Sequence, residues 1–338
     1  MANVSILGSG SYGAALAVLL QKNGHRVLLR SSTREKAERL KKERRIPSLP
    51  EVTLPPEIEV TNDLRLSCAG KAPDLIVLAA SSVHIRSLAR AMAPYVREGQ
   101  IVVNVAKGIE ESTLKTLSQQ IEEELPQARV AVLSGPSHAE EVGRGIPTTC
   151  VTGSQSRRTA ETVQNIFMCD SFRVYTNPDV LGIEIGGALK NVIALAAGIA
   201  DGLGYGDNTK AALITRGMAE ITRLAVAMGA RTETLYGLAG IGDLVVTCAS
   251  MHSRNRRAGI LIGRGATAAE AMREVNMVVE GVYAAKAGLA LARRYNTAMP
   301  IIENINAVLF EGKSPAACLN ELMLRDRCVE NASLKWGE

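Results

Sequence analysis

Lys190 is the residue whose surroundings point most directly to chemistry. On a helix its neighbours three and four positions away are Gly186, Gly187, Ile193 and Ala194, which form a small and apolar face. Lysine is almost never buried without a partner, so this face predicts an amine whose desolvation lowers its pKa from about 10.4 towards neutrality. Such an amine can exchange a proton with a substrate hydroxyl. The alternative is a lysine that packs its stem at a domain interface and keeps its charge in water.

Lys107 and Asp243 are two further candidates for the same chemistry. Lys107 follows an apolar run, and ligands of open α/β sheets bind at the carboxyl ends of the strands. Asp243 is a single carboxylate among glycines and apolar residues, so it could pair with Lys190 or with substrate hydroxyls. A lysine that simply faces solvent and an aspartate that caps a helix are the alternatives.

Two short segments have the composition of anion-binding sites. The segment His252-Ser253-Arg254-Asn255-Arg256-Arg257 suits a phosphate monoester because arginine binds phosphate through paired hydrogen bonds; the alternative is a charged helix start. The segment Ser134-Gly135-Pro136-Ser137-His138-Ala139 follows a strand and offers free N–H groups to an anion or a nicotinamide amide; the alternative is a plain strand-to-helix turn. His138 receives no acid–base role, since a surface or capping histidine is the commoner outcome.

Near the amino terminus, Gly8-Ser9-Gly10-Ser11-Tyr12-Gly13 forms a G-x-G-x-x-G pattern between a strand and a helix. In that context Gly8 allows a tight turn, Gly10 lets the backbone approach a pyrophosphate, and Gly13 allows the helix to pack on the strand. The helix N-terminus adds free N–H groups and a partial positive charge. The pattern therefore predicts a dinucleotide site.

The end of the second strand bears on the choice of dinucleotide. A strict NAD site places Asp or Glu there to bind the ribose 2′-hydroxyl, whereas this segment reads Leu29-Arg30-Ser31-Ser32-Thr33-Arg34. Arg30 or Arg34 could meet a 2′-phosphate, so we expect that NADP is tolerated or preferred; the alternative is that both arginines are solvated. Further along, Glu280 in Val278-Val279-Glu280-Gly281 could accept from a cofactor hydroxyl or cap the next helix.

Strands and helices that alternate must position these residues in the first half of the chain. Apolar runs typical of buried strands occupy residues 4–7, 26–30, 75–79, 101–105 and 130–133, and helical patterns occupy residues 14–22, 33–45, 83–93 and 112–124. An irregular crossing is marked by Pro47, Pro50, Pro55 and Pro56. The alternation predicts a parallel sheet covered on both faces, that is, a Rossmann-like, doubly wound α/β domain over residues 1–180.

Helical patterns dominate the rest of the chain, after a last strand-like run at residues 172–175. They cover residues 180–200, 210–228, 266–274, 281–295, 301–311 and 314–325. These patterns predict an all-α domain over residues 181–338. Helical domains with faces of small residues often pair, so we expect a homodimer.

Composition narrows the class of partner and the compartment. The net charge of +5 is local, because residues 34–45 hold seven basic and three acidic residues, and aromatic residues are only 3%. A nucleic-acid partner is therefore not expected, and the basic stretch is interpreted as a solvated helix. Six cysteines without a Cys-x-x-Cys pair predict free thiols, no metal site and a cytoplasmic location. The most apolar window, residues 180–203, is interrupted by charges, so no stable membrane insertion is expected.

In order along the chain, these motifs resemble those of the bacterial-type NAD(P)-dependent glycerol-3-phosphate dehydrogenases. The resemblance covers nearly the whole chain and is most specific where the Lys-Asn helix is followed by Gly-x-Gly-Asp-Leu and Ser-Arg-Asn. The motifs lie at residues 8–13, 133–137, 186–194, 215–217, 238–244, 253–256 and 278–281. The resemblance implies hydride transfer between NAD or NADP and C2 of sn-glycerol 3-phosphate or dihydroxyacetone phosphate, and a supply of glycerol 3-phosphate for phospholipid synthesis.

The same resemblance implies roles for single residues. Lys190 would be the proton acceptor, with Lys107 and Asp243 beside it. Substrate contacts would come from Lys107, Gly135, Ser137, Lys190, Asp243, Ser253, Arg254 and Asn255. Cofactor contacts would come from Ser11, Tyr12, Ser32, Lys107, Ala139, Arg254, Val278 and Glu280, together with Gly8, Gly10 and Gly13 of the glycine turn. Two positions depart from the family, since His138 stands where Phe is common and Ser31-Ser32 where Arg or His is often found.

Two other functions stay open from the sequence. A 3-hydroxyacid or 6-phosphogluconate-type dehydrogenase shares a dinucleotide domain followed by helices and a catalytic lysine, but the Ser-Arg-Asn and Gly-x-Gly-Asp-Leu segments argue against it. A non-catalytic dinucleotide sensor would bind the cofactor tightly without oxidising it in the presence of any phosphorylated ketone.

Overall fold

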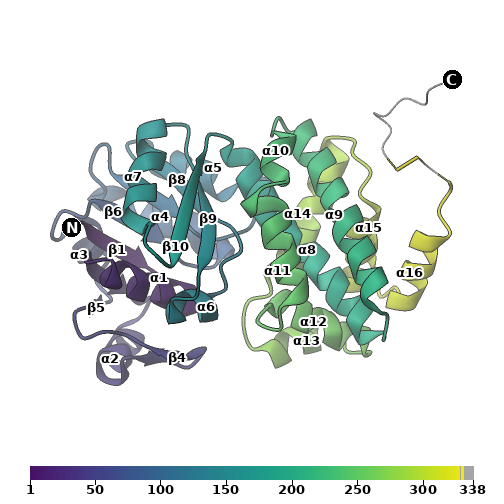
Figure 1. The fold of residues 1–338 in the computed structure, drawn as a ribbon, viewed down its shortest axis with the longest axis horizontal. Coiled ribbons are helices and arrows are strands. Elements are labelled where there is room, and N and C mark those ends of the chain that lie inside the picture. Colours follow the sequence, from purple (N-terminus) through teal and green to yellow (C-terminus); the bar gives the residue numbers. More distant parts are fainter. Residues whose placement is uncertain (328, 331–338) are drawn as a thin grey trace.

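An eight-stranded sheet forms the core of the first half of the chain in the computed structural model, which describes residues 1–327, 329 and 330 (Figure 1). The strand order is β10-β9-β8-β7-β6-β1-β2-β5. The strands are β1 (Asn3–Leu7), β2 (Arg26–Arg30), β5 (Glu59–Thr61), β6 (Leu75–Leu78), β7 (Ile101–Asn104), β8 (Arg129–Ser134), β9 (Thr148–Gly153) and β10 (Phe172–Asn177). Val4 of β1 pairs in parallel with Val27 on one side and Leu75 on the other, so β1 is an interior strand. The turn that follows β1 therefore lies at the carboxyl edge of the sheet, with a strand on either side.

Helices cover both faces of this sheet, which confirms the expected Rossmann-like α/β domain. One face packs against α1 (Ser11–Lys22), α6 (Ala139–Arg144) and α7 (Arg157–Phe167). The other packs against α3 (Leu64–Ala69), α4 (Ile85–Met92) and α5 (Leu117–Glu124). The buried strand residues are mostly Val, Ile and Leu, as a sheet buried on both faces requires.

This domain differs from the sequence-based expectation, which contained no β5, α3, α7 or β9, and three of the differences bear on its architecture. β9 runs antiparallel to β8, so the sheet is mixed; α6 lies at the carboxyl edge and the chain enters β9 from there. After α2 (Arg34–Glu43), the proline-rich stretch contains a small hairpin, β3 (Arg45–Ile46) and β4 (Leu49–Thr53). The helix expected from residue 112 begins only at Leu117, because residues 106–116 form a loop that is bridged between Ile109 and Thr116.

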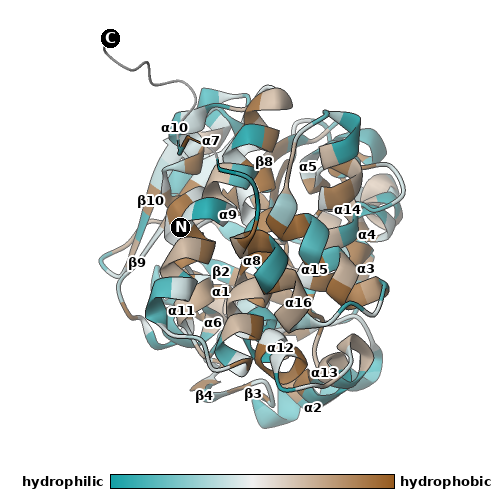
Figure 2. Ribbon diagram, turned by 90° about the vertical axis from the view of Figure 1, so that its right-hand side faces the viewer, coloured by the Kyte–Doolittle hydropathy of each residue, from teal (hydrophilic) through white to brown (hydrophobic). Residues whose placement is uncertain are grey.

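The second half of the chain folds into the expected all-α domain around one long helix, α8 (Val180–Gly202). The others are α9 (Asp207–Ala227), α10 (Thr232–Leu235), α11 (Asp243–Ala249), α12 (Arg254–Gly263), α13 (Ala268–Val275), α14 (Glu280–Arg294), α15 (Pro300–Phe310) and α16 (Pro315–Met323). By length and composition α8 could cross a membrane, but 89% of its most apolar window is buried inside the protein, among the helices shown in Figure 2. It is the core helix of this domain.

α12 crosses α8 with the two backbones almost in contact. A Cβ on Gly198 would lie 2.1 Å from the carbonyl oxygen of Arg256, and one on Gly259 would lie 2.2 Å from that of Leu195. Gly202 and Gly263 meet the facing backbone in the same way one turn further on. Only glycine permits this approach, which brings the start of α12 beside the turn of α8 that follows Lys190.

The sheet ends close to the boundary expected at residue 180. β10 ends at Asn177 and α8 begins at Val180, while the extent of each independently folding unit stays a prediction. Five of the six cysteines belong to the described part of the chain and are free thiols, and Cys328 lies outside the described residues. Within the described residues no three metal-ligating side chains form a cluster.

Candidate active site

A cleft of about 590 Å³ lies between the carboxyl edge of the sheet and the helical domain. The sheet domain lines it with the glycine turn, Lys107 and residues 137–140, and the helical domain lines it with Lys190, Thr247 and the start of α12. Most residues predicted from the sequence therefore meet at one place. Those in the lining are Gly10, Ser11, Tyr12, Lys107, Ser137, Ala139, Lys190, Ser253, Arg254, Asn255, Val278 and Glu280.

Asp243 lies behind this lining and binds both lysines. Lys190 Nζ donates to Asp243 Oδ1 at 2.5 Å, and Lys107 Nζ lies 2.6 Å from Asp243 Oδ2. Lys190 Nζ also donates to Thr247 Oγ1 at 2.5 Å, and Lys107 Nζ donates to the carbonyl oxygen of Gly135 at 3.1 Å. Because an ammonium group has three donors, Lys190 keeps one N–H for a ligand in the cleft, and Lys107, whose contact with Asp243 is an ion pair, keeps at least one.

Burial and mutual charge set the protonation of this cluster. Lys190 is 5% exposed; burial lowers its pKa to about 8 against the pull of Asp243, and the nearby Lys107 adds to the lowering. Burial alone would raise the pKa of Asp243, but the two ammonium groups outweigh it and hold that pKa below its usual value. Lys190 can therefore exchange a proton near neutral pH while Asp243 stays ionised.

Thr247 belongs to the same cluster and was not predicted from the sequence. Its hydroxyl accepts from Lys190 Nζ and donates to the carbonyl oxygen of Asp243 at 2.6 Å. Thr247 and Asp243 lie one turn apart on α11, so a spacing of four residues is the signal that identifies Thr247 once a helix is placed there. The sequence patterns did not indicate α11, which directly follows a π-helical turn at Leu238–Gly242.

The start of α12 forms the basic end of the cleft. Ser253 caps this helix, because its hydroxyl accepts from the Arg256 N–H at 3.2 Å. Arg256 is held by Asp201 at 2.8 Å and by the carbonyl oxygen of Ala249, whereas no carboxylate of the described chain forms an ion pair with Arg254. Arg254 and Arg257 both line the cleft without an ion pair in the described chain, and Arg254 is the less exposed of the two, so it is the better placed to bind an anion inside the cleft.

The glycine turn has the shape that a dinucleotide requires. Gly8 has a φ of +129°, and a Cβ there would lie 2.4 Å from the carbonyl oxygen of Ala79. A Cβ on Gly13 would lie 1.9 Å from the carbonyl oxygen of Gly8, so glycine is what lets α1 pack on the turn. Gly10 faces open space, and no side chain of the described residues caps α1, so the first N–H groups of this helix stay free of a side-chain partner there. These features fit a pyrophosphate.

The end of β2, next to this turn, contains no carboxylate. The buried Ser31 hydroxyl bonds to that of Ser9 at 2.6 Å, whereas Ser32 is exposed and does not line the cleft. Arg30 has a buried Nε without a hydrogen-bond partner in the described chain, and burial lowers its pKa. Arg34, the first residue of α2, is exposed. The basic residues expected near a 2′-phosphate are therefore present at this end of the sheet.

Glu280 links the two domains at the edge of the cleft. It is the first residue of α14 and accepts from the Ser82 N–H at 3.2 Å and from the Ser82 hydroxyl. Burial raises the pKa of this carboxyl group, although the bonds from Ser82 oppose the rise. The sequence motif indicated a cofactor contact or a helix cap for Glu280, and Ser82 is a partner that it did not indicate.

His138 lines the cleft and does not cap α6 through its side chain, in contrast to the common behaviour assumed for it. Its ring lies 5.9 Å from the ring of His252 in the helical domain, centroid to centroid. Burial, together with the charges of Lys190 and Lys107, lowers the pKa of His138 to about 4. The imidazole is therefore neutral at physiological pH. Beside it, the Ser137 hydroxyl bonds to the Tyr12 hydroxyl at 3.0 Å.

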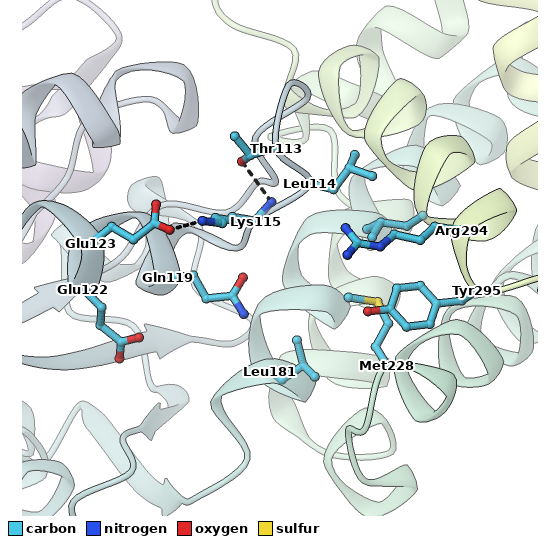
Figure 3. Close-up of a pocket in the computed structure, with 11 residues that line it drawn as sticks. Thr113, Leu114, Lys115, Gln119, Glu122, Glu123, Leu181, Met228, Arg294 and Tyr295 are labelled. Atoms are coloured by element: carbon cyan, nitrogen blue, oxygen red, sulfur yellow. Dashed lines mark hydrogen bonds and ion pairs between the residues drawn. The ribbon is translucent and has the colours of Figure 1, made fainter.

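A second hollow of about 520 Å³ lies between the domains, away from these residues (Figure 3). Residues 113–123 of the sheet domain form one wall, and Met228 and Tyr295 belong to the opposite wall. The Lys115 ammonium is paired with Glu123, and none of the predicted site residues lines this hollow. The predicted chemistry therefore gathers in the first cleft.

Two family models match the chain and together span most of it. The model described as NAD-dependent glycerol-3-phosphate dehydrogenase N-terminus matches residues 3–160. The model described as NAD-dependent glycerol-3-phosphate dehydrogenase C-terminus matches residues 179–320. The first match contains the glycine turn and Lys107, and the second contains Lys190, Asp243 and the start of α12.

Full-length relatives show the same similarity. A glycerol-3-phosphate dehydrogenase (NAD(P)+) of Agathobacter rectalis is 60% identical, over 99% of this chain and 100% of the relative. A protein of the same name from Fusobacterium nucleatum is 59% identical, over 98% and 99%. The crystal structure of glycerol-3-phosphate dehydrogenase from Coxiella burnetii has a TM-score of 0.91 to this fold at 34% identity, covering 96% of this chain and 99% of that one.

Proposed function

Because this chain belongs to the NAD-dependent glycerol-3-phosphate dehydrogenase family, we propose that its cleft interconverts sn-glycerol 3-phosphate and dihydroxyacetone phosphate with NAD or NADP as cofactor. The chain is an oxidoreductase with a Rossmann-like cofactor domain. The observation that carries the site assignment is the contact of one buried carboxylate, Asp243, with Lys190 and Lys107 at 2.5 and 2.6 Å. A substrate oxygen that reaches both lysines meets a proton donor and a stabilising charge together.

The two lysines have different roles at the C2 oxygen. In the reducing direction Lys190, as ammonium, gives a proton to this oxygen, and Lys107 offsets the negative charge that develops on it. In the oxidising direction the neutral Lys190 amine takes the proton of the C2 hydroxyl. Asp243 holds both lysines throughout, and Thr247 fixes the direction of the remaining Lys190 N–H by engaging another.

The substrate phosphate binds at the start of α12. Arg254 offers paired N–H donors, Ser253 and Asn255 add further donors, and the helix N-terminus favours negative charge. From the sheet domain, Gly135 and Ser137 bind the substrate beside Lys107. Because the phosphate is remote from the reacting carbon, its binding energy can orient C2 for the transfer.

Residues of both domains hold the dinucleotide. Gly10, Ser11 and the N-terminus of α1 bind the pyrophosphate, which the open space at Gly10 and the uncapped helix support. When bound, the nicotinamide supplies or accepts the hydride at C2. Further contacts come from Tyr12, Ser32, Lys107, Ala139, Arg254, Val278 and Glu280. The absence of a carboxylate after β2, with Arg30 and Arg34 nearby, supports NADP as tolerated or preferred.

Oxidation of the reduced cofactor by dihydroxyacetone phosphate, followed separately with NADH and NADPH, tests this proposal. We expect turnover with both cofactors and a kcat/KM with NADPH at least equal to that with NADH. Lys190→Ala should lower turnover about a thousandfold while the dinucleotide still binds in a fluorescence titration. Arg254→Ala should raise the KM for dihydroxyacetone phosphate tenfold or more, because a rise of this size corresponds to the loss of one hydrogen bond between charged groups. Near-normal turnover of Lys190→Ala would refute its role.

We further propose that this enzyme is a cytoplasmic homodimer. It supplies glycerol 3-phosphate for phospholipid synthesis. The small residues on the faces of the helical domain support the homodimer, because helical domains with such faces often pair. Free thiols at the described cysteines support a reducing compartment. Light scattering of the purified protein should give twice the chain mass of 36.0 kDa; a value equal to one chain would contradict the dimer.

A further inference from the structure

Two buried asparagines join the proposed phosphate site to the start of α14. Asn255 Nδ2 donates to Asn191 Oδ1 at 2.8 Å, and the Gly281 N–H donates to Asn255 Oδ1 at 2.8 Å. Asn191 and Asn255 are 5% and 7% exposed, and both line the cleft. A Cβ on Gly281 would lie 2.6 Å from the carbonyl oxygen of Asn191, so α14 packs directly against the backbone of α8 here.

The Gly281 N–H settles the orientation of both amides. A backbone N–H can only donate, so the atom of Asn255 that it reaches must be the oxygen, and the other must be the amino group. That amino group can only donate, so Asn191 must turn its oxygen towards Asn255. Asn255 thereby keeps one amide hydrogen that neither partner uses.

The oxygen of Asn191 has nothing to offer an anion. Oδ1 of this residue is engaged by Asn255, and an acceptor oxygen repels phosphate. Its Nδ2 already lies 3.5 Å from the carbonyl oxygen of Gly187, one turn back on α8. Lys190, its neighbour in sequence, is held by Asp243 and Thr247 and makes no bond to it. The oxygen of Asn191 and one of its two amide hydrogens are therefore engaged within the protein.

We propose that Asn191 is a positioning residue for the substrate phosphate. The oxygen of Asn191 engages one hydrogen of the Asn255 amide and thereby directs the second hydrogen towards a phosphomonoester bound beside Arg254. The inference rests on the proposed function, in which Asn255 binds the phosphate, and adds that Asn191 acts through Asn255 instead of touching the substrate. The same contact ties the phosphate site to Gly281 and hence to Glu280, the cofactor residue that begins α14.

Removal of the acceptor at position 191 tests the proposal in the full chain. In Asn191→Leu the new side chain has nearly the same size as asparagine. We expect the KM for dihydroxyacetone phosphate to rise about tenfold, which corresponds to the loss of one hydrogen bond to a charged group. The dissociation constant of NADPH, from fluorescence, and the pH midpoint of kcat/KM should not change, because Gly281 keeps its bond to Asn255 Oδ1 and Lys190 keeps Asp243 and Thr247. In an Asn255→Ala background, Asn191→Leu should produce no further rise in KM.

Asn306→Leu is the matched control. Asn306 is an equally buried asparagine of the helical domain, and its amide donates to the carbonyl oxygens of Ala285 and Ile302 at 2.8 and 2.9 Å, outside the cleft. Both leucine variants should melt at lower temperature than the wild-type protein, but only Asn191→Leu should raise the KM. Asn191→Ala carries the same prediction if the leucine variant does not fold.

The possible failures are distinguishable. An unchanged KM in Asn255→Ala would remove Asn255 from the phosphate site, which is a failure of the proposed function. A raised KM in Asn255→Ala with an unchanged KM in Asn191→Leu would overturn the inference alone. Equal rises from Asn191→Leu in both backgrounds would mean that Asn191 binds the substrate directly, and this too would overturn the positioning role.

Discussion

Among single residues, Asp243 organises the charge of the site. One of its oxygens accepts from Lys190 and the other lies against Lys107, so a single negative charge serves two positive ones. Without this carboxylate two ammonium groups would face each other in a buried space, and the pKa of Lys190 would fall further. With it, Lys190 stays partly charged near neutral pH. A group that gives a proton in one direction and takes it in the other needs this balance.

The pH dependence of the reaction should follow Lys190. With a pKa of about 8, Lys190 is an ammonium below that pH and a free amine above it. Reduction needs the ammonium, so its kcat/KM should fall about tenfold per pH unit above this pKa, whereas oxidation of glycerol 3-phosphate should rise up to it and then level off. Rates in both directions across this range provide the measurement.

Two variants check that the titrating group is Lys190. Asp243→Asn removes the charge that raises the pKa of Lys190, so its pH midpoint should move to lower pH. Lys190→Arg stays charged and cannot accept a proton, so it should lose the oxidation reaction. Identical pH profiles in the two directions would contradict the assignment.

The burial of Lys190 could be predicted from the sequence because all its neighbours on the helix are small or apolar. The partners of Lys190 were harder to predict, since they come from a segment more than fifty residues away. Asp243 was found because a lone carboxylate among glycines is unusual. Thr247 and Asn191 were missed because a threonine or an asparagine on a helix is ordinary until its partner is known.

The close crossing of α8 and α12 places the proposed phosphate site beside α8. Gly198→Ala should force the helices apart, because its Cβ would lie 2.1 Å from the carbonyl oxygen of Arg256, which is backbone. We expect a loss of stability of about 2 to 3 kcal/mol and a raised KM for dihydroxyacetone phosphate, since the start of α12 moves away from α8. Urea unfolding and steady-state kinetics measure both.

Gly206→Ala is the control for this crossing. A Cβ on Gly206 would meet nothing within 4 Å, so the same substitution just before α9 should leave the KM unchanged. If Gly198→Ala behaved like Gly206→Ala, close backbone packing would not be what positions α12.

Within the helical domain, Glu220 of α9 caps α15 from the inside. The carboxylate is 2% exposed and accepts from the Ile301 N–H at 2.9 Å and the Ile302 N–H at 3.4 Å. Burial raises its pKa from the ordinary 4.5 to about 7, despite these bonds. The folded protein therefore binds this proton more tightly than the unfolded chain, so stability falls as pH rises from about 4.5 through about 7.

In the wild-type protein the free energy of unfolding should fall by on the order of 3 kcal/mol as the pH rises through this window, whereas in Glu220→Gln it should not fall for this reason. Its amide oxygen still accepts from α15, but it has no titrating proton. The measurement is the free energy of unfolding of both proteins in denaturant, below and above this pH window. Parallel pH dependences would mean that Glu220 does not titrate between the two conditions.

Elements with a continuous apolar run or strong apolar periodicity were predicted from the sequence, but length alone did not decide this, because α7 was not predicted although it is as long as α15. α8, α9 and α14 carry strong apolar periodicity over several turns, and the buried strands are continuous apolar runs. β9 escaped prediction because Thr148-Thr149-Cys150 is not an apolar run, and its direction depends on where α6 ends in space. The pattern of residues 112–116 continues into α5 and therefore predicts a helix where the structure has the end of a loop.

Over the whole molecule, the two domains are joined by contacts that no local pattern reveals. Ile109 of the sheet domain is buried in the core of the helical domain. Glu184, in the second turn of α8, accepts from the Ser118 N–H at 2.9 Å and from the Ser118 hydroxyl at 2.5 Å, so it caps α5 across the boundary. Burial raises the pKa of Glu184, although the bonds from Ser118 oppose the rise. Glu280 and Ser82 form a second such contact at the cleft.

The contact between Glu184 and Ser118 should couple the unfolding of the domains. Ser118→Ala removes one donor to a buried carboxyl group and should cost about 2 kcal/mol. Because that bond crosses the boundary, calorimetry should show a broader transition, with a lower ratio of van't Hoff to calorimetric enthalpy than in the wild-type protein. Ser67→Ala is the control, since the buried Ser67 hydroxyl donates to the Asp63 carbonyl oxygen at 2.7 Å within the sheet domain. It should lower the melting temperature without broadening. Equal enthalpy ratios in the two variants would mean that the domains are held together elsewhere.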